Sequence, residues 1–104
     1  MSDGEPRLTT QTLKVLGVLM SRGQSEFSGA DIARSTRLAS GTLYPILMRL
    51  EQAGWAESHW EPGDPHELGR PRRRFYKVTG IGVKRARPAL QEMKVFTTGA
   101  LAWR

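Results

Sequence analysis

Between Ser40 and Gly54, apolar and polar residues alternate at the spacing of an α-helix with only one apolar side. At about 100° per residue, four aliphatic side chains gather on that side: Leu43, Ile46, Leu47 and Leu50. The opposite side has no such pattern and carries Gly41, Pro45, Met48, Arg49 and Gln52. Ser40 can cap the start of this helix, and Gly54 follows its end. The pattern predicts a helix that packs on a core and presents its outer side to a partner, although an ordinary surface helix shows the same periodicity.

The first helix of the chain is predicted to start at Thr9 or Thr10, either of which can cap it, and to end at Gly23. It is apolar on two faces: Leu13, Leu16, Gly17 and Met20 form one, and Val15, Val18 and Leu19 form the other. A helix that is apolar nearly all round must be covered on both sides. The second apolar face can be covered by the rest of the same domain or by a second subunit, and the pattern is compatible with both.

The segments around the Ser40 helix predict a helix-turn-helix followed by a β-hairpin. Upstream, the expected elements are a short strand at Ser25 to Phe27, a helix from Gly29 to about Arg34 that begins at the capping pair Ser28 and Asp31, and a turn at Ser35 to Ala39. Downstream, two strands are expected at Trp55 to Trp60 and Arg73 to Val78, joined by a mobile connection that Pro62, Gly63, Pro65 and Gly69 keep irregular. This order indicates a winged helix-turn-helix fold, mainly α with a small β-hairpin (α+β).

After Thr79, which can cap a helix, the chain predicts a last helix that Pro88 kinks or divides. Its second half repeats apolar residues at steps of four and three, the spacing of a helix-packing seam: Ala89, Met93, Phe96, Ala100 and Trp103. Packing on the first helix of the same chain is one explanation, but a homodimer also covers the second face of that first helix. The expected dimer interface comprises Leu13, Val15, Leu19, Leu90, Met93, Phe96 and Trp103.

The chain contains more basic than acidic residues. The chain has 104 residues, enough for one domain with a modest core, with 16 Lys and Arg against 10 Asp and Glu and a formal charge of +6. Residues 70–87 hold eight basic side chains and no acidic one, whereas residues 57–67 hold four acidic side chains and neither Lys nor Arg. Such an excess favours a polyanionic partner, but charge alone does not separate DNA, RNA and an anionic membrane.

Catalytic and metal-binding patterns are absent from the sequence. There is no cysteine, and the two histidines, His59 and His66, have no second ligand at metal spacing. No glycine-rich phosphate-binding motif occurs either, so the sequence predicts no enzyme and no cofactor. The polar opening MSDGEPR lacks the apolar core of a signal peptide, and no apolar run is long enough to span a bilayer. We therefore expect a cytoplasmic protein with no membrane partner.

Three motifs resemble the PadR-like family of bacterial transcriptional regulators. They are GTLYP at residues 41–45, RLEQAGW at 49–55 and FYKVTGIG at 75–82, in matching order and spacing. The similarity extends over about Leu13 to Leu90, and it implies a winged helix-turn-helix in a dimeric DNA-binding repressor. The expected organisation is a flexible N-terminal arm over residues 1–8, a DNA-binding domain over 9–79 and a C-terminal dimerisation helix over 80–104. Many relatives continue into a longer C-terminal domain, so a small-molecule effector stays an open question.

The expected DNA contacts divide between the Ser40 helix and the hairpin. On or beside the outer side of the helix they are Ser40, Thr42, Tyr44, Met48 and Arg49, and on the hairpin they are Arg70, Arg72, Arg73 and Arg74. We expect Asp64 and Glu67 to point away from DNA or to pair with those arginines. We call the Ser40 helix the reading helix, because it is the one expected to contact bases. The expected partner is double-stranded DNA with an inverted-repeat site, because a two-fold dimer presents two such helices. The alternative is a winged-helix module that binds protein or RNA.

Overall fold

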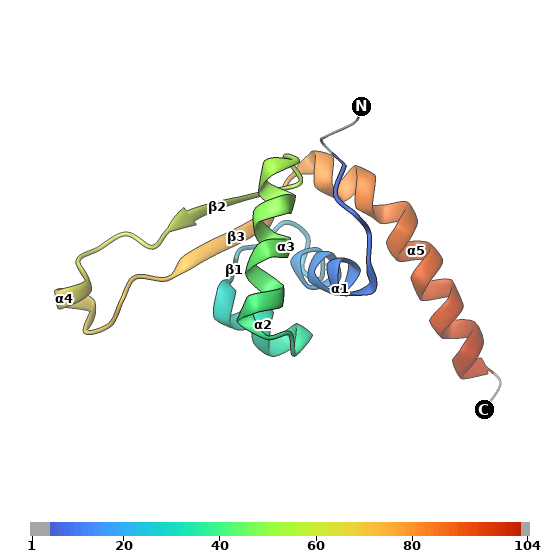
Figure 1. Cartoon of the computed structure of the whole chain (residues 1–104), viewed down its shortest axis with the longest axis horizontal. Helices are drawn as coiled ribbons and strands as arrows, with labels where there is room; N and C mark the ends of the chain where they lie inside the picture. The colour runs from blue at the N-terminus through green and yellow to red at the C-terminus, as the bar shows by residue number, and fades with distance from the viewer. Residues whose placement is uncertain (1–4, 103–104) are drawn as a thin grey trace.

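The structure is a computed structural model that describes the backbone of residues 5–102 and the side chains of residues 5–93. Its elements are α1 (Thr10–Leu19), β1 (Phe27–Ser28), α2 (Gly29–Thr36), α3 (Ser40–Gln52), β2 (Ala56–Trp60), α4 (Pro65–Leu68), β3 (Arg74–Val78) and α5 (Gly80–Ala102). Figure 1 shows a helical body from which the long hairpin, with α4 at its tip, and α5 extend on opposite sides. We call the hairpin formed by β2, residues 61–73 and β3 the wing.

A small antiparallel sheet joins the wing to the body. The strand order is β1-β3-β2, so β3 lies in the centre. Phe27 of β1 pairs with Tyr76 of β3, and β2 pairs with the other edge of β3 from Ala56 opposite Val78 to Trp60 opposite Arg74. The predicted short strand therefore does pair with the wing, although it covers residues 27 and 28 instead of 25 to 27. The winged helix-turn-helix architecture predicted from the sequence is confirmed.

The core lies where α1, α2 and α3 meet each other and β3. Leu16, Ile32, Leu43 and Val78 are fully buried there, and each such side chain contributes about 1.5–3 kcal/mol to folding. Trp55, which follows α3, is also buried.

The second apolar face of α1 belongs to this same core. Val15 and Leu19 are 0% exposed in the single chain. They therefore present no side-chain surface to a partner, and their expected place in a dimer interface is wrong.

Capping side chains set the starts of three helices. Thr9 accepts a hydrogen bond from the backbone N–H of Thr12, Ser28 from that of Asp31, and Thr79 from that of Gly82. Thr79 does more than cap, because its hydroxyl donates to the carbonyl of Gly54 at 2.7 Å and its N–H to that of Trp55 at 2.9 Å. The start of α5 is thereby joined to the turn that follows α3.

Helix α1 ends earlier than expected, and α5 shows which of the two expected effects Pro88 has. Helix α1 ends at Leu19, four residues before Gly23, and the chain continues in a turn. The Ser21 hydroxyl contributes to this ending, because it donates to the Val18 carbonyl that a longer helix would use. Helix α5 runs through Pro88 without a break and changes direction after its first turns in Figure 1. Pro88 therefore does not divide the helix, and a bend accommodates the missing N–H of its ring.

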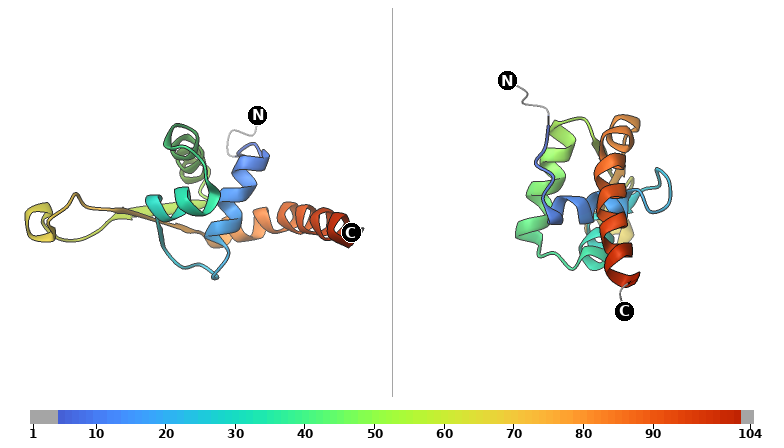
Figure 2. Two further views of the ribbon diagram at one scale, coloured as in Figure 1. Left: turned by 90° about the horizontal axis from the view of Figure 1, so that it is seen from below. Right: turned by 90° about the vertical axis from the view of Figure 1, so that its right-hand side faces the viewer.

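The wing tip contains a helical turn where the sequence predicts an irregular connection. Helix α4 begins with Asp64, whose carboxylate accepts the N–H of His66, and with Pro65 at the first helical position. It ends at Gly69, which has a φ of 71°. The prolines and glycines thus start and stop a short helix in addition to turning the chain. Figure 2 shows the wing and α5 extending to opposite sides in a second view.

Candidate nucleic-acid interface

The outer side of α3 is exposed, as its sequence pattern predicts. Ser40, Thr42 and Arg49 are exposed, and the Met48 side chain, an apolar group, is 53% exposed. Ala39, however, is the N-cap residue of α3, and its carbonyl accepts the N–H groups of Thr42 and Leu43. The expectation that Ser40 caps the helix is therefore wrong, because Ser40 is already the first helical residue. Within the described part of the chain its hydroxyl makes no hydrogen bond, so it is available to an anion at the helix start.

Tyr44 leans from α3 across the start of α2. A Cβ atom at Gly29 would lie only 2.4 Å from the Tyr44 hydroxyl oxygen, so the tyrosine occupies the place of the missing side chain. Its ring is nevertheless 43% exposed, and its hydroxyl can reach a partner from this position. Sequence reasoning identified Tyr44 but missed Gly29. The glycine directly after the capping Ser28 was the available signal, because glycine permits a close approach.

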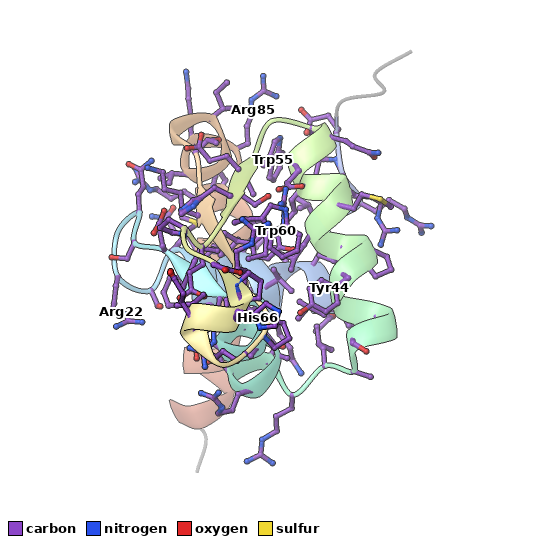
Figure 3. All side chains as sticks on the ribbon, turned by 90° about the vertical axis from the view of Figure 1, so that its left-hand side faces the viewer. Arg22, Tyr44, Trp55, Trp60, His66 and Arg85 are labelled. Atoms are coloured by element: carbon purple, nitrogen blue, oxygen red, sulfur yellow. The ribbon has the colours of Figure 1, made fainter. Side chains whose placement is uncertain are left out.

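A cleft of about 420 Å³ separates α3 from the wing. Its lining residues come from the start of α2, from α3 and from the wing: Ser28, Gly29, Ala30, Tyr44, Trp60, Arg72, Arg73, Arg74 and Tyr76. Figure 3 views the molecule from the wing side and shows Tyr44 on α3 and Trp60 on the wing, which line the same cleft, with Arg22 and Arg85 at the margins. The structure therefore brings Tyr44 together with three of the four predicted wing arginines.

Two further aromatic side chains, Trp60 and Tyr76, form part of this cleft, and neither was among the expected DNA contacts. The Arg74 guanidinium lies 4.9 Å from the ring centre of Trp60, at the distance of a cation–π contact, and Trp60 remains 54% exposed. Tyr76 is nearly buried, and this burial raises the pKa of its phenol, so the hydroxyl stays protonated at neutral pH. The cleft thus offers cationic, hydroxyl and aromatic groups, a combination suited to nucleic acid.

Arg70 is engaged elsewhere in the wing. Its Nη1 and Nη2 atoms donate to the two carboxylate oxygens of Glu61 at 2.7 and 2.8 Å. The Arg70 guanidinium is the main reason that the pKa of the Glu61 carboxyl lies at about 2. The sequence suggested Arg70 as a DNA contact, and in the single chain both terminal nitrogens of its guanidinium donate to Glu61. Its acidic partner is Glu61, whereas the carboxylate of Asp64 caps α4.

The residues of the expected dimer interface fall into three groups. Leu13 and Met93 are half-buried and line a cavity of about 430 Å³ together with Leu8, Ala89 and Glu92. Leu90 is half-buried and packs against the core, whereas Val15 and Leu19 are enclosed within it. The side chain of Phe96 and the whole of Trp103 lie outside the described residues.

Neither a metal-ion cluster nor a membrane-spanning helix occurs in the described part of the chain. Across residues 5–93 no three His, Cys, Asp or Glu side chains gather into a group that could hold a metal ion. In the same part of the chain no helix combines the length and the apolar character needed to cross a membrane.

Comparison with solved structures identifies transcriptional regulators of similar fold. S. aureus MepR in its DNA-binding conformation superposes with a TM-score of 0.75 at 18% identity, over 93% of this chain and 66% of MepR, slightly less than two thirds of its length. A PadR family regulator from Clostridium difficile gives a TM-score of 0.68 at 21% identity, over 91% of this chain and 98% of that protein. A PadR-like transcription factor from Bacteroides fragilis gives 0.66 at 21% identity, with 91% and 90% covered. At these identities the likeness establishes the fold.

Sequence comparison establishes the family. Curated protein sequences give no significant match. The sequence model described as the transcriptional regulator PadR-like family, in contrast, matches residues 16–87, well over half of the chain. These residues include α3, the wing and the cleft between them. The chain therefore belongs to the PadR-like family of transcriptional regulators and is not an enzyme.

Proposed function

We propose that the protein binds a specific double-stranded DNA site as a homodimer in the cytoplasm and represses transcription there. The observation that carries this proposal is the cleft in which Tyr44 of α3 lies with Arg72, Arg73 and Arg74 of the wing. Met48 lies one helical turn beyond Tyr44 and is exposed, and Arg49 follows it. A helix of this kind fits the major groove, while the wing arginines can bind phosphates beside it. A dimer that occupied two half-sites within a promoter would exclude polymerase from it, and repression would follow.

The proposal assigns different roles to the two contact elements. Arg49 and Met48 on α3 read bases, because arginine can pair with guanine and an apolar side chain can meet a thymine methyl group. Arg72 and Arg73 on the wing bind phosphates, which carry no sequence information. Loss of a reading residue should therefore change sequence preference, whereas loss of a phosphate contact should weaken binding to all sequences alike.

Binding isotherms on a selected site and on a scrambled duplex, at several salt concentrations, test this division. Arg49→Ala should cost about 1–3 kcal/mol on the selected site and much less on the scrambled one. Arg72→Ala or Arg73→Ala should weaken both duplexes equally and reduce the slope of log K against log salt by about one. Arg87→Ala, which removes the same charge from an exposed position on α5, is the matched control.

Three results would contradict the proposal. Equal losses on both duplexes for Arg49→Ala would remove Arg49 from the reading residues. A sequence-selective loss for the wing variants would overturn the division of roles. Binding to RNA or to protein, with no salt-sensitive binding to duplex DNA, would favour the interaction-module alternative.

A further inference from the structure

Glu61 joins three points of the wing. Its backbone N–H donates to the carbonyl of Arg73 at 2.7 Å, and its Oε1 accepts the backbone N–H of Arg73 at 3.2 Å. The same carboxylate accepts both terminal nitrogens of Arg70, which follows α4. Glu61, which follows β2, is therefore bonded both to Arg73, which precedes β3, and to Arg70, which follows α4. Residues 62–72 are closed into a fixed loop by these bonds.

This contact is better shielded than the other ion pairs of the described chain. The side chains of Glu61 and Arg70 are 18% and 36% exposed, whereas those of Asp31 and Arg34 are 50% and 74% exposed. The two-pronged geometry fixes the direction of the guanidinium as well as its distance. Because the pKa of Glu61 is about 2, the carboxylate stays charged throughout the neutral and mildly acidic range.

The segment that Glu61 fixes carries the cationic wall of the cleft. Arg72 lies inside the closed loop and Arg73 at its end, and both line the cleft opposite Tyr44. Trp60, the residue before Glu61, lines the same cleft, and the Arg74 guanidinium packs against its ring. A wing without the Glu61 contacts would have to be ordered when DNA binds, which costs binding free energy.

We propose that Glu61 is a positioning residue for DNA binding, which holds the wing so that Arg72 and Arg73 face the cleft and keeps Arg70 from contacting DNA. This inference rests on the proposed function. It reverses the simple electrostatic expectation, because a carboxylate on a DNA-facing wing repels phosphate and its removal alone should strengthen binding. The positioning role predicts the opposite, namely that removal of Glu61 weakens binding.

The test compares Glu61→Gln, Arg70→Gln and the double variant on the same duplex. Each single variant should bind about three- to tenfold more weakly, since a wing that is mobile before binding must be ordered at the interface. The double variant should be no weaker than either single one, because both changes break the same contact. Glu67→Gln, on the exposed side of α4, makes the same charge change without touching the contact and should bind at least as tightly as the wild type.

Limited trypsin digestion supplies a readout that needs no DNA. Cleavage after Arg72 or Arg73 should be faster in Glu61→Gln and in Arg70→Gln than in the wild type or in Glu67→Gln, because the loop opens. Loss of Arg70 removes no cleavage site of comparable quality, since Pro71 follows it.

Tighter binding by Glu61→Gln, together with weaker binding by Arg70→Gln, would overturn the inference and make Arg70 a direct phosphate contact. Unchanged digestion in both variants would overturn the fixed wing itself. If the wild type binds no duplex DNA, the proposed function fails, while the digestion experiment still decides whether Glu61 orders the wing.

Discussion

At the scale of single residues, Gly82 allows α5 to begin against the turn that follows α3. A Cβ atom at this position would lie 2.2 Å from the carbonyl oxygen of Trp55 and 2.8 Å from Cγ2 of Val78. Neither neighbour can move freely, because the Trp55 carbonyl accepts the N–H of Thr79 and Val78 is fully buried in the central strand. The position therefore excludes every larger residue for steric reasons.

We predict that Gly82→Ala lowers the free energy of unfolding by about 1–3 kcal/mol, as forced overpacking does elsewhere. Urea denaturation followed by circular dichroism measures this change. Gly80→Ala is the matched control, since nothing lies within 4 Å of a Cβ atom at this first residue of the same helix. That control should leave stability unchanged or raise it by up to about 1 kcal/mol, because alanine favours a helix more than glycine does. Equal effects at the two positions would contradict the steric argument.

At the scale of elements, an ion pair connects the edge strand β1 to the wing. His59 on β2 contacts the carboxylate of Glu26, next to β1, and stacks on Phe75 of the strand between them, with ring centres 5.9 Å apart. The hydrogen bond that the His59 imidazole donates to the Glu26 carboxylate is the main reason that the pKa of His59 is raised, and the charge of Lys77 opposes it. The charged imidazole is therefore favoured in the folded state.

This raised pKa fixes the sign of a pH effect. The stabilisation is fully present below the unfolded-state pKa of about 6.5 and is lost as pH rises through the higher folded-state value. We therefore predict that Tm falls between about pH 6 and pH 8 in the wild type more than in Glu26→Gln, in which the main cause of the raised pKa is removed. Thermal unfolding across this range measures the difference. Parallel pH profiles for the two proteins would show that the pair does not affect stability.

The elements also show which parts of the fold could be predicted from the sequence. Helix α3 and the caps at Ser28 and Thr79 were predictable because they depend on local spacing and on side chains that bond their own backbone. Helix α4 was missed because four residues are too few to show a helical period. The pairing of Glu61 with Arg70 depends on how the wing closes, and the sequence offers several equivalent acids in that segment. The sequence could predict that α3 and the wing lie close together, but it could not predict the shape of the cleft between them. That shape depends on Gly29, because a side chain at this position would collide with Tyr44.

At the scale of the whole molecule, the shape separates two surfaces. The chain measures 53 × 40 × 25 Å, and the wing and α5 extend to opposite sides of the body (Figure 2). The cleft lies between α3 and the wing, whereas the cavity lined by Leu13 and Met93 lies between α1 and α5. A second subunit at that cavity would therefore leave the cleft open to DNA.

We predict that the protein is a dimer at micromolar concentration and that Met93→Asp shifts it toward monomer. The aspartate would place a charge in an apolar contact that excludes water, which is costly when the charge is unpaired. Sedimentation equilibrium measures the association. Gln91→Asp introduces the same acid on the same helix at an exposed position and should leave the dimer intact. A monomeric wild type would contradict the prediction. Two reading helices about one DNA turn apart, roughly 34 Å, would then no longer be expected.

Thr79 gives this arrangement a mechanical property. Because its hydroxyl and N–H both bond to the turn after α3, we expect α3, the proposed reading helix, and the start of α5 to move together as one lever. The longer arm of that lever is α5, whose 23 residues measure roughly 34 Å along the bent helix axis. In a dimer built on α5, a small change in the angle between the two levers would rotate both reading helices as rigid bodies and alter their separation. A molecule that acts on the subunit contact could thus release DNA from a distance, without touching a single base or phosphate.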